Sequence, residues 1–367
     1  MHPQWPDPVS TPGTRSAADI RAWIVGELCA AQKLDHAAID TAAPLYSLGV
    51  DSVTAIGVTG ALASWLDRDL PATLMWDHPS IDAICEALSG GKSAVPERQG
   101  MVTLQAHGDR VPLFCFPGAG GHSTTFAPLA ARLGAAHPCF GLTVPGLNRE
   151  HAPLERVEDI AGVMLDNLRR VQPHGPYQLA GYSFGGLLAY EVAQQLRASG
   201  EKISLLAIYD TFTPAGLVLR PRWQRLVLHA HVLATRPERG EYIRKQLERR
   251  RKERDARIFR IAGGEGPTQQ EKIAAEVEWA NTRAIPHYRP RPYPDPVVLF
   301  RTLHRKKEAI FYRIDYQSNG WGALTEGRVR IVDLPGTHED ILSAEHAQGA
   351  ADKLRPFLSE ERCILAG

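Results

Sequence analysis

Residues 175–196 read GPYQLAGYSFGGLLAYEVAQQL, and this stretch decides the fold of the larger part of the chain. A short apolar run leads into the pentapeptide Gly-x-Ser-x-Gly at residues 181–185, and a helical pattern of apolar residues begins directly after it. A serine at the apex of a sharp turn between a strand and a helix is in the setting of a nucleophile. The turn needs small residues on both sides of the serine, because bulky side chains would clash with the strand and the helix. The stretch therefore predicts Ser183 as a nucleophile.

The rhythm of the chain around this stretch predicts an α/β domain. Short apolar runs (VPLFCF, PCFGLTV, ISLLAIYD, PVVLF and VRIVDL) alternate with helical stretches such as residues 160–171. The apolar stripe of that helix comprises Ile160, Val163, Met164 and Leu168. This alternation is typical of a mostly parallel sheet covered by helices. Residues 212–290 break the rhythm, contain no convincing strand and are expected to form several helices, which makes them a candidate lid.

A serine hydroxyl is a poor nucleophile until a base removes its proton, so a histidine held by a carboxylate should follow later in the chain. We select His338 from the 14 histidines because it lies in VRIVDLPGTHEDIL, just past the last predicted strand. A short loop with a glycine can carry an imidazole over the serine there. His287 and His304 lack this setting, and His346 falls within the expected last helix.

The candidate acid is Asp210, at the end of the run ISLLAIYD, which gives the chain order Ser, Asp, His. The next strand is followed only by Glu308, several residues beyond its end, and Asp333 before the histidine loop is kept as a reserve. The alternative for Asp210 is a cap on the first helix of the candidate lid.

Acyl transfer through a serine also needs two backbone N–H groups that stabilise the oxyanion. We expect one from Phe184, directly after the serine, and one from Ala119 in the glycine-rich loop at residues 117–121. That loop lacks the Lys-Ser/Thr ending of a phosphate-binding Walker motif, so a phosphate cradle is not expected.

The first quarter of the chain has a different texture. Residues 1–15 contain four prolines and predict a flexible leader. Residues 16–90 predict a small all-helical domain, because apolar residues recur at helical spacing in three places: Ile20, Ile24 and Leu28; Val53, Ile56 and Leu62; and Ile81, Ile84 and Leu88. Residues 91–101 are small, polar and unpatterned, which predicts a linker. The α/β domain is then expected to occupy residues 102–367.

One serine of the helical domain is a second candidate site. The segment LYSLGVDSVTA places Ser52 directly after Asp51, behind a glycine-containing loop and at the start of a predicted helix. The positive end of a helix dipole favours a phosphate ester at that point. On these residues alone, Asp51 or Ser52 would simply cap the helix.

The segment LGVDSV at residues 48–53 resembles the attachment motif of acyl and peptidyl carrier domains, and LPATLMWDHPSIDAI further on resembles their loop and final helix. The resemblance spans residues 16–90. It implies that Ser52 carries 4'-phosphopantetheine, whose thiol holds an acyl chain as a thioester. The aspartate before the serine resembles polyketide-type carriers slightly more than most peptidyl ones.

The segments PLFCFPGAGG, GYSFGG and GTHEDIL resemble the thioesterase domains that end polyketide and nonribosomal peptide synthases, over about residues 101–358. The resemblance implies an α/β-hydrolase fold with a helical lid, and a reaction in which Ser183 takes the acyl chain from the pantetheine thiol. Water or an internal nucleophile then releases the chain. It also implies as partners the upstream synthase modules, a phosphopantetheinyl transferase, and the chain's own carrier domain docking on its thioesterase domain.

Three other functions are weighed against this one. A general serine esterase, or an acyltransferase to an external alcohol or amine, would use the same Ser183. The carrier resemblance argues against a general esterase, and transfer to an external alcohol or amine remains an alternative. A docking and carrier module with an inert hydrolase fold would need none of the serine, acid and histidine candidates.

Charge is distributed unevenly along the chain. The whole chain has a formal net charge of +1, but residues 16–90 hold 10 acidic and 3 basic residues, and residues 220–260 hold 14 basic and 5 acidic ones. The basic segment is either a solvated helical face or a surface that guides the acidic carrier or its phosphate by attraction.

Bulk properties exclude several classes of protein. A chain of 367 residues is too long for one ordinary domain, and the near-neutral net charge and the absence of a recognition fold speak against nucleic acid. The five cysteines show no paired spacing, so neither disulfides nor a metal site is expected. No apolar run approaches the ~20 residues that span a bilayer, so we expect no membrane partner and a cytoplasmic location.

Overall fold

A computed structural model describes the chain apart from residues 1–14, 33–38, 44, 49, 51, 67, 69, 71–73, 79, 90–99, 107, 148–151, 236–243, 245–268, 304–311, 316 and 363–367. The chain divides into two compact units, residues 1–98 and 99–367, and each has its own hydrophobic core.

The first unit is helical. Its elements are α1 (Ala17–Gln32), η2 (Leu45–Leu48), α2 (Ser52–Leu66), α3 (Leu74–Asp77) and α4 (Ile81–Leu88). The α1 face predicted from the spacing of Ile20, Ile24 and Leu28 is buried. The Arg21 guanidinium on α1 donates to Asp82 on α4 across 2.8 Å, and Ser80 caps α4 by accepting from the Ala83 N–H.

Two details of this unit differ from the sequence-based expectation. The single-turn helices η2 and α3 were not predicted, because four residues are too few to show a helical period. Helix α2 buries Ala55, Val58 and Leu62, whereas the predicted face began at Val53, whose side chain lies outside the described residues together with that of Ile56. A helix this rich in apolar and small residues has no polar face that would identify its inner side.

The second unit contains a seven-stranded sheet in the order β1-β3-β2-β4-β5-β7-β9. All neighbouring pairs are parallel except β1 with β3. The strands are β1 (Met101–Gln105), β2 (Leu113–Phe116), β3 (Cys139–Leu142), β4 (Tyr177–Tyr182), β5 (Ile203–Tyr209), β7 (Val297–Thr302) and β9 (Val329–Leu334). The six apolar runs found in the sequence thus form six of the seven strands.

The seventh strand, β1, begins at Met101, inside the stretch predicted as a linker. Met101 and Val102 are buried and pair with Leu142 and Gly141 of β3, so this edge is part of the folded unit. The strand was not recognised because only its first two residues are buried and the following three are half-exposed.

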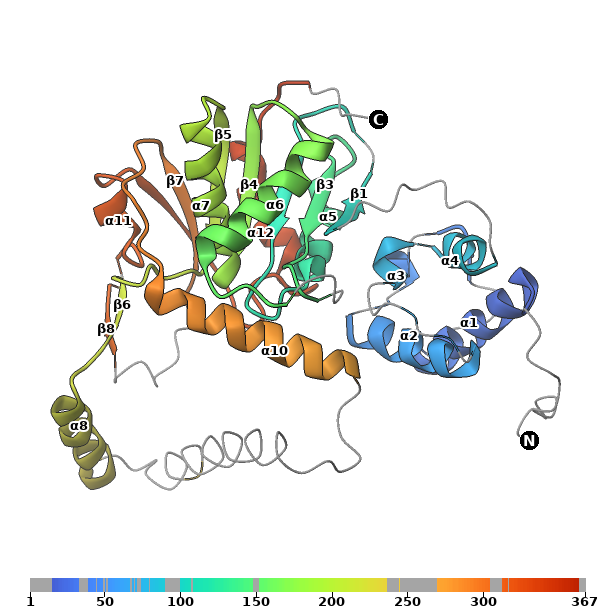
Figure 1. Cartoon of the computed structure of the whole chain (residues 1–367), viewed down its shortest axis with the longest axis horizontal. Helices are drawn as coiled ribbons and strands as arrows, with labels where there is room; N and C mark the ends of the chain where they lie inside the picture. Colours follow the sequence, from blue (N-terminus) through green and yellow to red (C-terminus); the bar gives the residue numbers. More distant parts are fainter. Residues whose placement is uncertain are drawn as a thin grey trace. The chain divides into compact units, whose positions relative to one another are not determined.

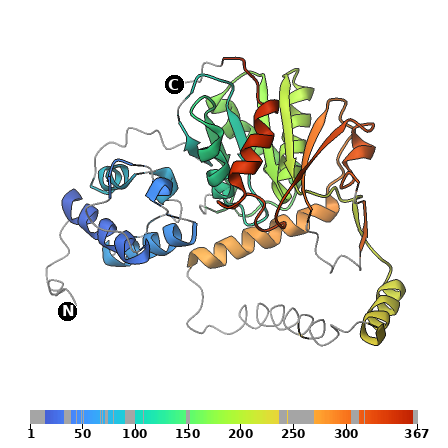
Figure 2. The same ribbon diagram turned by 180° about the vertical axis from the view of Figure 1, so that it is seen from behind.

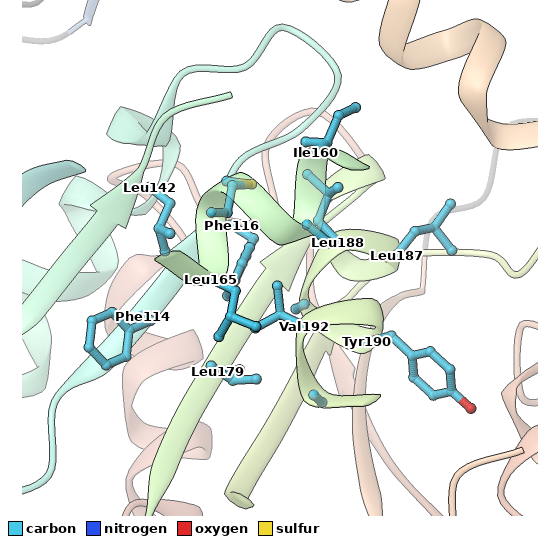
Figure 3. Packing of buried hydrophobic residues seen from close by; sticks show 14 of the residues in the cluster. Phe114, Phe116, Leu142, Ile160, Leu165, Leu179, Leu187, Leu188, Tyr190 and Val192 are labelled. Atoms are coloured by element: carbon cyan, nitrogen blue, oxygen red, sulfur yellow. The ribbon is translucent and has the colours of Figure 1, made fainter. Parts of the chain in front are cut away.

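Helices cover both faces of the sheet (Figures 1 and 2). Helices α6 (Val157–Val171) and α7 (Phe184–Ala198) pack in the larger core cluster, and α5 (Ala127–Leu133) and α12 (Ala347–Leu354) pack in the cluster on the other face. Figure 3 shows Phe116 and Leu179 of the strands meeting Leu165 of α6 and Leu188 of α7. The remaining short elements are η3 (Ser123–Phe126), η4 (Ile285–His287), α11 (Trp321–Leu324) and η6 (Arg355–Phe357).

Helix α6 departs from its predicted stripe in one position. The helix begins at Val157, and Val163 is partly exposed to solvent, whereas Ala161 and Leu165 are buried. Since α6 contacts both the sheet and α7, its buried surface is wider than one stripe and extends beyond the predicted residues to Ala161 and Leu165.

The candidate lid contains a strand, so the expectation of a purely helical insertion was wrong. Strand β6 (Leu217–Leu219) pairs antiparallel with β8 (Tyr312–Ile314), which lies far beyond the insertion in the sequence. Three residues are too few to show strand alternation, and the partner cannot be read from local sequence. Helices α8 (Arg222–Thr235) and α10 (Gln269–Ala284) are also described, and α10 runs across one end of the sheet (Figure 1).

No helix in the described ranges is long and apolar enough to cross a membrane.

Helix α7 should be a main source of stability in the second unit, because both its faces are buried. Leu188→Ala removes a fully buried side chain and leaves a cavity, so the free energy of unfolding should fall by about 2–5 kcal/mol. Leu226→Ala on α8, where the side chain is 69% exposed, should change it by less than about 0.5 kcal/mol. Urea unfolding of the full chain measures both; equal stability of the two variants would contradict the prediction.

Candidate active site

Ser183 occupies a sharp turn between β4 and α7. Its backbone has φ 55° and ψ −121°, a conformation that costs a non-glycine residue of order 1–3 kcal/mol. A Cβ on Gly181 would lie 2.1 Å from the Gly185 carbonyl oxygen, and one on Gly185 would lie 2.2 Å from the Phe116 carbonyl oxygen. Side chains are therefore excluded at both glycines of the pentapeptide, which is the steric reason for the motif.

Hydrogen bonds hold this turn against the next strand. The Ser183 N–H donates to the Tyr209 carbonyl at the end of β5 across 3.0 Å, and the Thr211 hydroxyl donates to the Ser183 carbonyl across 2.7 Å. A Cβ on Gly186 would lie 2.1 Å from the Thr211 hydroxyl oxygen, so this third glycine makes room for that bond.

His338 bridges the serine and an acid. Its Nε2 lies 3.0 Å from Ser183 Oγ, and its Nδ1 lies 2.9 Å from Asp210 Oδ2. The tautomer that satisfies both contacts carries the proton on Nδ1, which donates to the carboxylate, and leaves Nε2 free to accept from the serine hydroxyl. The structure thus brings together all three side chains that the sequence analysis selected.

Asp210 directly follows β5 and is almost fully buried. Its backbone adopts φ 45°, and its N–H donates to the Phe300 carbonyl across 2.7 Å. The carboxylate accepts from the Thr302 N–H at Oδ1, across 3.2 Å, while Oδ2 faces His338. Because each oxygen has its own donor, the direction of the carboxylate is fixed.

The loop that carries His338 is held from two sides. The Tyr182 hydroxyl donates to the His338 carbonyl across 2.6 Å, and the Tyr182 ring stacks on the imidazole with centroids 5.2 Å apart. Burial, and then the nearby carboxylates, raise the pKa of Tyr182 well above its usual value, so its hydroxyl stays a donor. Asp340 accepts from the Thr337 N–H, and this bond lowers the pKa of the Asp340 carboxyl.

The other acids and histidines considered in the sequence lie elsewhere. Asp333 is on β9 and pairs with Arg301 of the neighbouring strand β7. His287 belongs to η4 and is exposed, and His346, expected inside the last helix, lies at the N-cap of α12, 3.8 Å from Asp340. Its backbone hydrogen bond to Ser343 belongs to the turns before the helix. Glu308 and His304 lie outside the described residues.

The glycine-rich loop lies beside the serine, as β2 and β4 are neighbours in the sheet. A Cβ on Gly118 would lie 3.7 Å from Ser183 Cβ. The Gly121 N–H closes the loop by donating to the Gly118 carbonyl across 2.9 Å. Within the described residues, the N–H groups of Phe184 and Ala119 donate to no backbone carbonyl outside their own elements, as an oxyanion site requires.

Ser52 is the first residue of α2 in the other unit. The N–H groups of a helix start and its dipole suit the phosphate of an ester such as 4'-phosphopantetheine. Its side chain and all of Asp51 lie outside the described residues. Across the described part of the chain, no cluster of His, Cys, Asp and Glu could hold a metal ion.

Sequence reasoning missed Tyr182, Thr211 and Asn281. Tyr182 and Thr211 bond to His338 and Ser183, and the Asn281 amide on α10 donates to the Ala119 carbonyl across 2.7 Å. Tyr182 could have been suspected because it lies inside the pentapeptide. Asn281 has no such signal, since its contact joins residues 162 positions apart.

Comparison with known proteins gives each unit a family. The thioesterase domain family matches residues 111–240, and the phosphopantetheine attachment site family matches residues 22–88. The second match makes the helical unit a phosphopantetheine attachment domain.

Relatives and solved structures agree with these matches. The chain is 27% identical to microperfuranone synthase of Emericella nidulans over 324 residues, 84% of this chain and 34% of the relative. Among solved structures, it resembles a four-domain nonribosomal peptide synthetase bound to AMP and glycine (TM-score 0.55, 20% identity, 97% of this chain and 27% of that one). It also resembles the NocB thioesterase domain from the nocardicin cluster (TM-score 0.50, 21% identity, 70% of this chain and 97% of that one).

The chain spans between 2% and 37% of the length of the curated relatives it matches. The likeness to the NocB domain identifies the second unit as an α/β-hydrolase-like fold. The chain therefore joins a phosphopantetheine attachment domain to a thioesterase domain, and several of the proteins that it resembles are nonribosomal peptide synthetases.

Proposed function

We propose that this chain releases the finished product of a biosynthetic assembly line, with Ser183, His338 and Asp210 as the catalytic residues. The observation that carries the proposal is the pair of contacts from His338, 3.0 Å to Ser183 Oγ and 2.9 Å to Asp210 Oδ2. The phosphopantetheine attachment domain in the same chain supports a thioester as the substrate, which a general serine esterase would not need. The contacts of His338 also argue against an inert hydrolase fold.

The carrier arm supplies a thiol to which the acyl chain is bound as a thioester, and Ser52 is the residue that we propose to hold it. A phosphopantetheinyl transferase would attach the arm, and upstream modules would load it. The Asp51 that precedes Ser52 favours a polyketide-type chain in this proposal.

In the first half-reaction, Ser183 Oγ attacks the thioester carbonyl carbon while His338 Nε2 takes the hydroxyl proton. The carbon–sulfur bond then breaks, and the leaving sulfur receives that proton from Nε2. Asp210 keeps the imidazole in the required tautomer and stabilises its positive charge. The product of this step is an ester on Ser183.

In the second half-reaction, water, or a hydroxyl or amine of the acyl chain itself, attacks this ester. His338 takes the attacking proton and returns it to Ser183 Oγ as the ester bond breaks. Release is therefore hydrolysis or cyclisation; an external alcohol or amine in the same position would give transfer instead. In both halves, the N–H groups of Phe184 and Ala119 would stabilise the oxyanion.

Residues 212–290 are proposed as a lid that limits the access of water and shapes the acyl site. Helices α8 and α10, the short helix η4 and strand β6 are its described elements. The basic segment at residues 220–260 is proposed to attract the acidic carrier, but only residues 220–235 and Arg244 of it lie within the described residues.

The path from Ser52 to Ser183 can be tested on the full chain. The unmodified protein and the variants Ser183→Ala, Ser52→Ala and Ser199→Ala are each subjected to the same acyl-pantetheine loading reaction, and the acyl mass on each is followed by mass spectrometry. We expect Ser183→Ala to retain the acyl group, Ser52→Ala to accept none, and Ser199→Ala, changed at the far end of α7, to release it like the unmodified chain. Persistent loading of the unmodified chain would refute Ser183-dependent release.

The role of Asp210 predicts a large effect from a small change. In Asp210→Asn, the amide oxygen still accepts from the Thr302 N–H, so the NH₂ group faces His338 Nδ1 and selects the wrong tautomer of the imidazole. The kcat for a soluble acyl thioester should therefore fall about 10⁴-fold. Asp333→Asn is the control, as that acid pairs with Arg301; its kcat should stay within about threefold of the unmodified value. Reversed effects would make Asp333 the acid.

Tyr182→Phe keeps the ring against the imidazole but removes the hydrogen bond to the His338 carbonyl. We expect the free energy of unfolding to fall by about 1 kcal/mol, and kcat to fall about three- to tenfold because His338 is less well oriented. Tyr293→Phe is a matched control, as the buried Tyr293 hydroxyl has no hydrogen-bond partner within the described residues. Steady-state kinetics that do not distinguish the two variants would contradict a role in orientation.

A further inference from the structure

Helix α10 carries one polar side chain on its buried face. Among the side chains described for this helix, the buried ones are Val277, Ala280, Asn281 and Ala284, and Asn281 is only 1% exposed. Val277 and Ala284 belong to the larger core cluster of the second unit. A polar residue in this apolar row calls for a specific partner.

The partner of Asn281 is the Ala119 carbonyl oxygen, 2.7 Å from Nδ2. A carbonyl only accepts, so the NH₂ group of the amide must face it. The other end of the amide, Oδ1, is buried and has no partner within the described residues. An apolar side chain of similar size would avoid that unsatisfied oxygen, so packing alone does not explain an asparagine here.

The loop that receives this bond has little stiffness of its own. Ala119 lies between Gly118 and Gly120, and glycines allow the adjoining peptides a wide range of orientations. Among the described residues, the loop makes two backbone bonds, Gly121 N–H to the Gly118 carbonyl and Val144 N–H to the Gly121 carbonyl. The first restrains the peptide that contains the Ala119 N–H, because that peptide also contains the Gly118 carbonyl, but neither bond engages the Ala119 carbonyl. The bond from Asn281 restrains the peptide on the other side of Ala119, which contains the Ala119 carbonyl. With the peptides on both sides held, φ and ψ of Ala119, and with them the direction of its N–H, are restrained.

We propose that Asn281 is a positioning residue, which holds Ala119 so that its N–H points at the oxyanion formed beside Ser183. The inference rests on the proposed function, in which Ala119 is the second oxyanion donor. It makes the docking of α10 a condition for full activity, because displacement of this helix releases the loop. The candidate lid thereby controls the chemical step as well as access to the site.

The first test removes the bond and keeps the volume. Asn281→Leu should lower kcat for a soluble acyl thioester about ten- to hundredfold and leave KM within about twofold, because a charge that develops in the transition state loses a well-placed donor. Val277→Ala is the control: it truncates a fully buried side chain on the same face and keeps the bond to Ala119. Its kcat should stay within about twofold although its stability falls; equal loss of kcat in both variants would reduce Asn281 to a packing residue.

The second test uses the pH dependence of Asn281→Asp. A protonated carboxyl can donate to the Ala119 carbonyl, whereas a carboxylate can only repel it. The ratio of kcat in Asn281→Asp to kcat in the unmodified chain should therefore rise as the pH falls, and the same ratio for Asn281→Leu should stay flat. A flat ratio for both variants would overturn the positioning role, since a purely structural role gives no such difference.

A third measurement separates this inference from the proposed function. A fluorophosphonate labels an activated serine without thioester turnover, and labelling of Ser183 in Asn281→Leu should slow by a factor similar to the fall in kcat. If Ser183 is labelled more slowly in Asn281→Leu than in the unmodified chain, but the unmodified chain hydrolyses no thioester, only the proposed function is rejected. Unchanged kcat and unchanged labelling in Asn281→Leu would reject the role of Asn281 alone.

Discussion

The strained backbone of Ser183 is the constraint on which the rest of the second unit, residues 99–367, depends. A residue at φ 55° and ψ −121° persists only where its surroundings fix it. The surroundings here are the bond from the Ser183 N–H to Tyr209, the bond from Thr211 to the Ser183 carbonyl, and three glycines without room for a side chain. Helix α7, buried on both faces, begins at the strained turn and supplies the packing energy that offsets the strain.

Sheet order then determines which side chains meet at this serine. The carboxyl ends of parallel strands lie at one edge of a sheet, which is where α/β proteins build their sites. The loop after β2 brings Ala119, the turn after β4 brings Ser183, Asp210 follows β5, and the loop after β9 brings His338. Residues more than 150 positions apart thus reach hydrogen-bonding distance without any long extension of the chain.

The sequence could reveal these four positions because each has a local signature: a strand followed by a glycine, a serine, an acid or a histidine. It also revealed six of the seven sheet strands, whose apolar runs are nearly continuous. It could not reveal β6 and β8, because each is three residues long and is specified by its partner. Nor could it reveal the buried partners of the site: Thr211 and Asn281 resemble ordinary loop and helix residues until the fold brings them to Ser183 and Ala119.

The two serines that define the proposed function differ in what their helices require of them. Ser52 is the first residue of α2, where the free N–H groups of the helix start would stabilise the phosphate ester that we propose. No base is needed, because another enzyme would attach the group. Ser183 lies directly before a helix, with a backbone that a regular helix start would not adopt, and its hydroxyl lies 3.0 Å from His338 Nε2. A serine that caps a helix accepts from the N–H groups of its first turn, whereas Ser183 makes no such bond. Its hydroxyl is thereby left for His338 Nε2 and, in the proposed function, for attack on the thioester.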